Sequence, residues 1–435
     1  MSSTSSTPST SSASSASAGY WTPSARPAVP AAPSAAPPAV FREPLVDGRP
    51  APPWGPRNLD GRSRAWSDAQ RLLERADIRL NGDRPWDLQV HHPLTLDRVL
   101  AQGSLGLGDS YVEGWWDCEQ LDGFFTRILK AGLDAEVGWK ARAWPWLRAR
   151  LCNLQSRWRA GEVARVHYDL DPEMFERMLG PSMAYSCGYW ARAQQLDDAQ
   201  HDKLDLVCRK LGLGPGMTLL DIGCGWGSLM RHAAEHYGAR VTGLTISREQ
   251  ARWVHERLRG LPVQVECMDY RQFNRQGGQR FDRVASIGMF EHVGHKNHEA
   301  FFGLMERSLR ADGWALLHTI GKNRAGGHTD AWIDQRIFPN GALPSAGELA
   351  TSAERRFVIE DWHNFGADYD RTLMAWHARF EAAWPTLARR HGQRFRRLWR
   401  YYLLSCAGTF RARSNQLWQL VLAPGGVRGG YRRIS

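Results

Sequence analysis

The sequence has no paired cysteines, no long apolar run and almost no charge before Arg42. Its seven cysteines are scattered singly, without a CxxC pair, so a disulfide-stapled fold is disfavoured and a reduced, cytoplasmic chain is expected. No segment approaches the ~18 consecutive apolar residues that a membrane-spanning helix needs. Residues 1–60 are mainly Ser, Thr, Ala and Pro, and only Arg26 is basic before Phe41, whereas a transit peptide carries several arginines. We interpret this segment as a disordered leader.

What the chain does have is length, positive charge and tryptophan. Its 435 residues leave room for two folded domains, and its apolar content of 43% can fill ordinary cores. The net charge of +11 suits nucleic acid and anionic lipid equally well, and 20 tryptophans make the chain rich in side chains that prefer interfaces.

The region before the basic stretch predicts a small helical unit. Ser67 and Gln70 form a capping box that predicts a helix start at Ser67. An apolar stripe at helical spacing predicts a second helix over 118–132. The glycine-rich segment Gly103–Trp116 lacks the Lys-Ser/Thr of a phosphate loop, and it favours a structural turn.

Residues 139–165 are rich in both tryptophan and arginine. Their apolar residues recur at helical spacing, which fits a helix lying in an anionic membrane interface. Pro145 interrupts the pattern, however, and a connector with a solvated basic face fits equally well. Both interpretations stay open.

The remaining chain alternates strands and helices. Asp171 and Pro172 predict a helix start, and Gly180 predicts its end. Apolar runs separated by helical segments then predict a parallel α/β sheet with strands near 217–222, 239–244, 262–267, 281–287 and 313–320. The late run 416–422 predicts an additional edge strand.

A glycine-rich turn follows the first of these strands. Asp221 ends the strand, and glycines at 223, 225 and 227 allow close approach of a ligand. A dinucleotide site would place an acidic residue at the end of the second strand, but that position reads Thr245–Gln250, so NAD is disfavoured. Asp269 and Tyr270 follow the third strand and suit an adenine amino group and ring.

Chemistry-bearing residues follow the next two strands. Glu291 and His292 come after one strand and His318 lies at the end of the other, on the edge where ligands of α/β sheets bind. Together with the glycine turn, they point to transfer of a carbon unit from S-adenosylmethionine. The simpler alternative is a satisfied polar pair and a structural histidine. The close set of His292, His295 and His298 lacks a carboxylate or cysteine at ligand spacing, so no metal is expected.

These motifs resemble those of cyclopropane-fatty-acyl-phospholipid synthases over residues 65–425. Gly103–Trp116 is similar to the amino-terminal domain of the bacterial phospholipid enzymes. The other segments that carry the resemblance are Tyr168–Leu170, Tyr185–Trp190, Asp221–Gly227, Leu244–Ser247, Met289–Gly294, His318–Gly321, Phe338–Gly341, Glu360–Asp370 and Ala407–Arg413.

The resemblance implies a class I S-adenosylmethionine-dependent methyltransferase fold: a Rossmann-like α/β sheet with a smaller, mainly helical N-terminal domain. The expected domains are a lipid-binding domain with its basic linker over 61–165 and a catalytic domain over 166–435. The resemblance further implies a homodimer at the inner face of the cell membrane, with an anionic phospholipid surface as its partner.

The implied reaction moves a methylene group to the cis double bond of an unsaturated phospholipid acyl chain. The double bond attacks the activated methyl group, and a bound bicarbonate takes a proton so that the ring closes. The implied bicarbonate contacts are Cys187, Glu291, His318, Ile320 and Tyr369. The implied S-adenosylmethionine contacts are Tyr185, Ser186, Asp221, Gly223, Cys224, Gly225, Thr245, Ser247, Gln250, Asp269 and Tyr270.

Three alternatives to this cyclopropane-forming reaction remain. A lipid C-methyltransferase could instead give a methylene-branched or hydroxylated chain, although the set of Glu291, His318 and Tyr369 favours ring closure. A nucleic-acid methyltransferase would show a base-flipping motif, which is missing, so no nucleic acid partner is expected. An inert lipid-binding module would have no use for the intact glycine turn.

Overall fold

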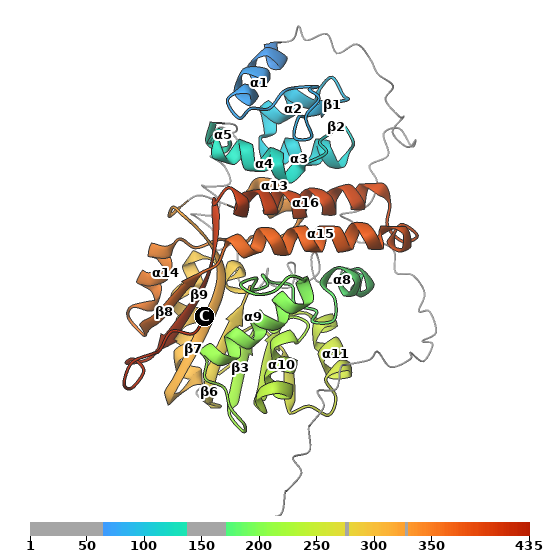
Figure 1. The fold of residues 1–435 in the computed structure, drawn as a ribbon. Coiled ribbons are helices and arrows are strands. Elements are labelled where there is room, and N and C mark those ends of the chain that lie inside the picture. Colours follow the sequence, from blue (N-terminus) through green and yellow to red (C-terminus); the bar gives the residue numbers. More distant parts are fainter. Residues whose placement is uncertain (1–63, 137–170, 275–277, 327–328) are drawn as a thin grey trace, which may run out of the picture. The chain divides into compact units, whose positions relative to one another are not determined.

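The computed structural model describes residues 64–136, 171–274, 278–326 and 329–435 (Figure 1). The predicted leader over 1–60 and the basic stretch over 139–165 lie outside the described residues. No helix in the described ranges is long and apolar enough to cross a bilayer.

A seven-stranded sheet in the order β5-β4-β3-β6-β7-β9-β8 forms the centre of the fold. The first five strands in this order are parallel, and β9 runs antiparallel to both of its neighbours. The bounds are β3 Thr218–Ile222, β4 Arg240–Thr245, β5 Val263–Cys267, β6 Phe281–Ile287, β7 Leu309–Lys322, β8 Val358–Asn364 and β9 Asn415–Ala423. The five predicted parallel strands are confirmed.

The prediction of an edge strand over 416–422 was wrong in its position. β9 lies between β7 and β8, and nearly all of its residues are buried. An apolar run of this kind is typical of a strand that is covered on both faces and paired on both sides. The edge strand on this side of the sheet is β8, whose polar residues such as Asp361 and His363 made it hard to recognise as a strand in the sequence.

Helices cover both faces of the sheet, because successive strand residues enter opposite cores. Leu219 packs in the core under α9 Leu196–Lys210, α10 Ser228–Tyr237 and α11 Arg248–Arg257. Its neighbour Leu220 packs in the core under α12 His298–Ser308 and α14 Ala346–Ala353. The inner parallel strands are therefore buried on both sides, as expected of a doubly covered sheet, whereas the edge strand β5 is partly exposed.

Helix α8, Pro172–Leu179, begins and ends where the sequence predicts. The Asp171 side chain accepts a hydrogen bond of 3.0 Å from the Glu173 N–H, and Pro172 occupies the first turn. The chain leaves the helix at Gly180, whose φ of 76° favours glycine.

The N-terminal part is a small helical unit with one short two-stranded antiparallel sheet. Its elements are α1 Arg64–Glu74, β1 Gln89–Val90, α2 Thr95–Gln102, α3 Ser104–Val112, β2 Trp116–Asp117, α4 Leu121–Lys130 and α5 Leu133–Glu136. The helix predicted over 118–132 is confirmed as α4, whereas α1 begins before Ser67, so that serine does not start it.

The prediction of a turn over Gly103–Trp116 was wrong, because residues Ser104–Val112 form helix α3. A Cβ on Gly106 would overlap the Arg98 carbonyl of α2, and a Cβ on Gly108 would overlap the Trp332 indole of α13, Ala331–Arg336. The glycines therefore permit close helix packing at the cost of helix propensity.

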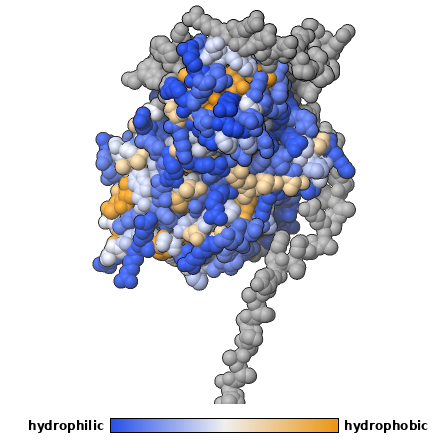
Figure 2. All heavy atoms as spheres, turned by 45° about the horizontal axis from the view of Figure 1, so that its top comes forward, coloured by the Kyte–Doolittle hydropathy of each residue, from blue (hydrophilic) through white to orange (hydrophobic). Residues whose placement is uncertain are grey.

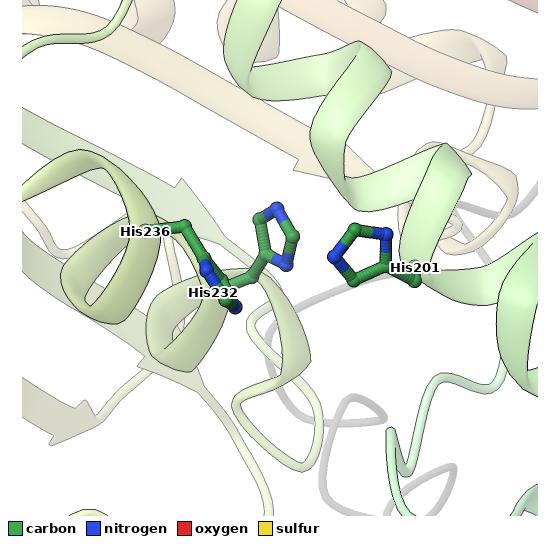
Figure 3. Close-up of side chains that lie close together, drawn as sticks. All are labelled: His201, His232 and His236. Carbon is green, nitrogen blue, oxygen red and sulfur yellow. The ribbon is translucent and has the colours of Figure 1, made fainter. Parts of the chain in front are cut away.

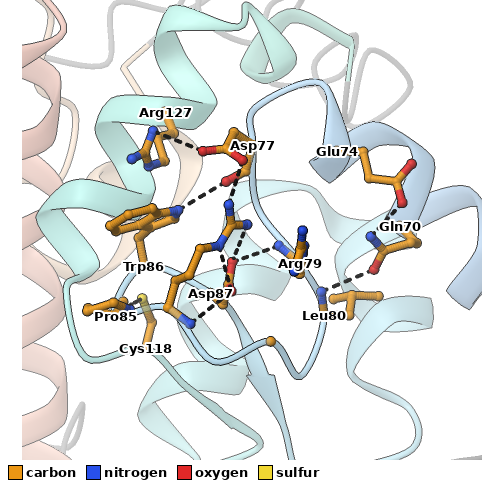
Figure 4. A network of polar contacts seen from close by, with 12 residues as sticks. Gln70, Glu74, Asp77, Arg79, Leu80, Pro85, Trp86, Asp87, Cys118 and Arg127 are labelled. Atoms are coloured by element: carbon orange, nitrogen blue, oxygen red, sulfur yellow. Dashed lines mark hydrogen bonds and ion pairs between the residues drawn. The ribbon is translucent and has the colours of Figure 1, made fainter.

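A buried carboxylate organises the loop between α1 and β1 (Figure 4). The Asp87 oxygens accept hydrogen bonds from Arg84 Nη2 at 2.8 Å and Nε at 3.0 Å, and from the Arg79 N–H at 2.8 Å. Burial alone would raise the pKa of Asp87, but these bonds outweigh it and lower the pKa. The paired charges hold this loop in one conformation.

Two long helices join the N-terminal unit to the sheet. Helix α15, Ala367–Leu387, packs against α16, Gln393–Arg411, and α16 contacts both α3 and α4. Arg397 of α16 donates hydrogen bonds of 2.6 Å to the Tyr111 carbonyl and 2.8 Å to the Trp116 carbonyl. Arg411 forms an ion pair with Asp122 of α4. The N-terminal unit is thus held to α16 by charge-assisted bonds.

Candidate active site

The glycine turn after β3 has the left-handed backbone that only glycine adopts easily. The φ angles are 85° at Gly223, 54° at Gly225 and 79° at Gly227, which begins α10. A Cβ on Gly223 would lie 2.6 Å from Met289, whereas a Cβ on Gly225 would meet no protein atom within 4 Å. The backbone at Gly225 is therefore open to a ligand.

Asp221 sits beside this turn as a buried carboxylate with 2% exposure. Burial raises its pKa to about 7, and the buried Lys203 of α9 acts in the opposite direction. Burial lowers the pKa of Lys203 to about 8, and its Nζ donates a 3.0 Å hydrogen bond to Ser186 Oγ. The sequence analysis did not identify Lys203. A lysine on the buried face of a helix nonetheless indicates that its ammonium group is paired with a polar or charged group.

Thr245, Ser247 and Gln250 form one network at the start of α11. Thr245 Oγ1 donates to Gln250 Oε1 at 2.8 Å, and Ser247 Oγ accepts from the Gln250 N–H at 3.2 Å. Ser247 is therefore the N-cap of α11. The network fixes three predicted cofactor contacts relative to one another.

Asp269 and Tyr270 follow β5, as predicted. The Asp269 carboxylate already accepts hydrogen bonds from the protein, whereas the Tyr270 hydroxyl does not take part in one among the described residues. Arg271 engages the Asp269 carboxylate through its N–H at 2.8 Å and its Nε at 2.9 Å. The Tyr270 hydroxyl is buried without a partner among the described residues, and its ring contacts Phe301. A ligand at Asp269 must share the carboxylate with Arg271.

The segment between α8 and α9 contributes Tyr185, Ser186 and Cys187. The Tyr185 hydroxyl lies 2.9 Å from the Tyr402 hydroxyl, so this side chain joins the segment to α16. Cys187 is fully buried, with Sγ 3.1 Å from the Gly188 carbonyl oxygen, and burial raises the pKa of its thiol well above the ordinary value. A neutral thiol of this kind does not act as a nucleophile.

Glu291 lies in the short helix η3, Phe290–His292, directly after β6. Its Oε1 accepts a 2.7 Å hydrogen bond from the Ile320 N–H of β7. Its Oε2 is buried and has no partner among the described residues. Burial raises the pKa of Glu291 to about 7.

His318 of β7 is 1% exposed, and burial holds its pKa well below the ordinary value. Its Nδ1 lies 3.2 Å from Nε2 of Gln419, the residue opposite it on β9. Because an amide nitrogen donates, this contact assigns the ring proton to Nε2. That Nε2 is buried and has no partner in the described part of the chain. Gln419 also escaped the sequence analysis.

Tyr369 lies in the first turn of α15 and is 9% exposed. Burial raises the pKa of its hydroxyl well above the ordinary value, and Cys187 and Glu291 lie close enough to raise it further. The structure thus places Tyr369 near Cys187 and Glu291 and joins Glu291 to Ile320, while His318 lies two residues before Ile320 on β7.

The polar atoms of this group are suited to a small anion with one O–H. His318 Nε2–H and the Tyr369 hydroxyl can donate hydrogen bonds, and Glu291 Oε2 can accept one. An unpaired buried polar atom costs roughly 1–3 kcal/mol, and this group has two of them, Glu291 Oε2 and His318 Nε2. Bicarbonate therefore fits the residues present.

The sheet and its glycine turn define a class, the S-adenosylmethionine-dependent methyltransferases. Coclaurine N-methyltransferase bound to N-methylheliamine and SAH shares the fold with a TM-score of 0.58 at 23% identity, over 73% of this chain and 98% of that chain. The cyclopropane synthase MmaA2 from Mycobacterium tuberculosis gives a TM-score of 0.57 at 34% identity, over 60% and 98%. The mycolic acid cyclopropane synthase CmaA1, solved with SAH and CTAB, gives 0.56 at 35% identity, over 60% and 97%.

Within this class, the family is shown by the sequence. Residues 155–420 match the family model for mycolic acid cyclopropane synthetase. The chain is also 51% identical over 367 residues to the cyclopropane-fatty-acyl-phospholipid synthase of Escherichia coli strain K12, which covers 84% of this chain and 94% of that protein. The chain belongs to this family of S-adenosylmethionine-dependent enzymes, and the predicted family, fold and enzyme class are confirmed.

Proposed function

We propose that this enzyme transfers a methylene group from S-adenosylmethionine to the cis double bond of unsaturated phospholipid acyl chains and forms a cyclopropane ring. The 51% identical relative is named for that activity. The observation that carries the proposal is that Glu291 Oε2 and His318 Nε2 are both buried without a partner among the described residues, one just after β6 and the other on its neighbour β7.

S-adenosylmethionine would be held mainly by residues at the carboxyl ends of β3, β4 and β5. When bound, it supplies an electrophilic methyl group on a positively charged sulfur. The open backbone at Gly225 allows close approach, and the Thr245 network and the buried Asp221 offer polar contacts. The other proposed contacts are Tyr185, Ser186, Gly223, Cys224, Ser247, Gln250, Asp269 and Tyr270.

The reaction leaves a positive charge on the acyl chain and needs a base. The π electrons of the double bond form a bond to the methyl carbon, the carbon–sulfur bond breaks, and a cation remains on the chain. Loss of a proton from the new methyl group then closes the ring by a second carbon–carbon bond. A strong nucleophile in the site would trap the cation, and the neutral, buried Cys187 avoids this.

A bound bicarbonate would supply the base. Glu291 would accept its O–H, and His318 Nε2 and the Tyr369 hydroxyl would each donate a hydrogen bond to its oxygens. The Ile320 N–H acts indirectly, because it is already donated to Glu291 Oε1 and so orients the carboxylate. Cys187 would contribute only to the wall of the site.

Aromatic rings near the site would stabilise the cation. Phe365 has its ring centroid 5.7 Å from that of His318 and 5.4 Å from that of Tyr189. A cation over a ring in a dry pocket gains about 2 kcal/mol or more. Of the aromatic residues near the motifs, we therefore assign this role to Phe365 and Tyr189.

The enzyme would act as a peripheral protein at an anionic membrane surface, on the inner face of the cell membrane and as a homodimer. The surface in Figure 2 is largely hydrophilic and is interrupted by small apolar patches. Leu94 and Leu100, beside and within α2, are among the exposed large apolar residues. Residues 61–165 would then bind lipid and residues 166–435 would carry the chemistry.

Vesicle binding tests the membrane part. Changing Arg148, Arg150 and Arg157 together to Gln should weaken binding to anionic vesicles, since each basic residue near such a surface adds ~1 kcal/mol. Binding to neutral vesicles should hardly change. Equal binding of variant and wild type to anionic vesicles would favour the connector interpretation of residues 139–165.

Mass spectrometry tests the reaction. Purified protein is incubated with vesicles of unsaturated phospholipid and S-adenosylmethionine, with and without added bicarbonate. We expect acyl chains to gain the mass of one CH₂ and to lose the double bond, with bicarbonate increasing the rate. A product that keeps a double bond identifies a methylene branch, and a product that also gains water identifies hydroxylation. Either one overturns ring closure.

A further inference from the structure

Three histidines outside the active site face one another across two helices (Figure 3). His201 lies on α9, while His232 and His236 lie one turn apart on the same face of α10. Each offers a ring nitrogen, and the three nitrogens lie within 4.8 Å of one another. Within the described ranges, this is the one group of three His, Cys, Asp or Glu residues that could hold a metal ion.

The central histidine of this group is buried and lacks a partner. His232 is 5% exposed, and its Nε2 has no hydrogen-bond partner among the described residues. Its ring centroid lies 5.0 Å from that of His201 and 4.5 Å from that of His236. A buried ring nitrogen without a partner is costly, and it points to a ligand between the rings.

We propose that His201, His232 and His236 bind a divalent transition metal ion of the zinc type. Zinc binds histidine nitrogen at about 2.0–2.1 Å in a tetrahedral arrangement, so ligand nitrogens lie roughly 3.4 Å apart. The exposed rings of His201 and His236 can rotate to close the remaining distance, while His232 is the fixed ligand. Three imidazoles leave the fourth position to water.

A carboxylate stands beside the group, as is common for metal-binding histidines. Asp202 Oδ1 lies 3.7 Å from His201 Nδ1, where it can orient the ring once a metal engages the other nitrogen. Imidazole ligands without thiolates suit zinc, copper and nickel and disfavour magnesium or calcium.

The ion would tie together two helices that serve the cofactor site. Helix α9 carries Gln200 and Lys203, which donate hydrogen bonds of 2.8 and 3.0 Å to Ser186. The N-cap of helix α10 is Gly227, the last glycine of the turn. The site is therefore structural in our proposal, and binding should stabilise the fold by mass action.

Metal titration of the full chain without a histidine tag tests this proposal. After treatment with a chelator and removal of the chelator, the wild-type protein should bind one Zn²⁺ per chain and melt at a higher temperature. The exposed ligands give variants that should still fold. His201→Gln and His236→Gln should each weaken zinc binding roughly tenfold or more and reduce the rise in melting temperature.

A matched control and a spectroscopic probe make the result decisive. His255→Gln changes an exposed histidine of the neighbouring helix α11 and should leave zinc binding unchanged. Co²⁺ in the site should give the visible bands of nitrogen and oxygen ligation without the thiolate charge-transfer band. Unchanged zinc affinity in both ligand variants, a thiolate band, or no zinc binding by the wild-type protein overturns the proposal.

Discussion

The Ile320 N–H donates a 2.7 Å hydrogen bond to Oε1 of Glu291 and thereby fixes the direction of that buried carboxylate. The bond joins the short helix after β6 to the carboxyl-terminal end of β7. It leaves Oε2 as the free atom of the group. The role of Glu291 therefore depends on whether Oε2 accepts a hydrogen bond.

Replacing Glu291 by Gln tests that role. The amide oxygen can still accept from Ile320, so an NH₂ group takes the place of Oε2 and donates where the carboxylate would accept. We expect kcat to fall about 10²-fold or more, the usual range for loss of an acid–base group. The Kd for S-adenosylhomocysteine, measured by calorimetry, should hardly change.

Glu360→Gln is the matched control for this prediction. Glu360 of β8 also accepts a backbone hydrogen bond, from the Val427 N–H at 2.6 Å. Its loss of charge should leave kcat at the wild-type level. A Glu291→Gln enzyme that turns over at the wild-type rate would remove Glu291 from the site chemistry.

The pH dependence of stability should carry the signature of Glu291. Burial raises its pKa to about 7 from an ordinary value of 4.5, so the folded state holds the proton more tightly than the unfolded state. The stabilisation is fully present below pH 4.5 and is lost as the pH rises through about 7. Burial also raises the pKa of Asp221, so Asp221 contributes a pH dependence of the same sign. The part that belongs to Glu291 is therefore found by comparing the wild-type protein with Glu291→Gln.

Urea unfolding at about pH 5 and about pH 8 isolates this contribution. Between these values the wild-type protein should lose more free energy of unfolding than Glu291→Gln, because glutamine does not titrate. Identical pH slopes for the two proteins would mean that Glu291 ionises freely in the folded state.

The sequence predicted those residues of the site that lie next to a strand end in the chain. Each strand end is followed directly by its polar residues, so the carboxyl edge of the sheet and the glycine turn could be inferred from short segments. Asp221, Glu291 and His318 all lie where that reasoning expects them.

The missed residues belong to contacts between distant segments. Gln419 reaches His318 only because β9 inserts beside β7, and no local pattern specifies that neighbour. Lys203 reaches Ser186 through the packing of α9. The glycines of α3 suggested a turn because Trp332, which requires them, lies far away in the sequence.

Gln419 should control which nitrogen of His318 carries the proton. Its amide nitrogen lies 3.2 Å from His318 Nδ1, and a donor there keeps the proton on Nε2. Gln419→Leu removes the donor, and Gln419→Glu replaces it with an acceptor that draws the proton to Nδ1. We expect kcat to fall in the order wild type, Leu variant, Glu variant, with the Kd for S-adenosylhomocysteine preserved. Equal rates for the Leu and Glu variants would contradict a tautomer effect.

Lys203 should support cofactor binding through Ser186 and Asp221. In Lys203→Met, the 3.0 Å bond to Ser186 is lost and the opposing charge near Asp221 disappears, so the pKa of Asp221 should rise further. We expect the Kd for S-adenosylhomocysteine to increase roughly tenfold, the effect of losing ~1.4 kcal/mol.

Lys210→Met separates this local effect from general destabilisation. Lys210 is a second buried lysine of α9, and it pairs with Asp361 at 3.0 Å. Its removal leaves the buried Asp361 carboxylate with only its 3.6 Å ion pair to Arg433, and it should lower the melting temperature, while the cofactor Kd stays near the wild-type value. If both variants weaken cofactor binding equally, the effect belongs to the fold and not to Ser186.

The close approach of α3 to α13 should make Gly108 intolerant of even one added carbon. A Cβ at this position would overlap the Trp332 indole, which is itself fully buried. Although alanine favours a helix by up to ~1 kcal/mol over glycine, overpacking costs about 1–3 kcal/mol. Gly108→Ala should therefore lower the free energy of unfolding. Gly347→Ala in α14 meets no atom within 4 Å and should leave stability equal or higher. Comparable urea midpoints for the two variants would mean that α3 is free to move away from Trp332, and that the glycines of this segment serve something other than helix packing.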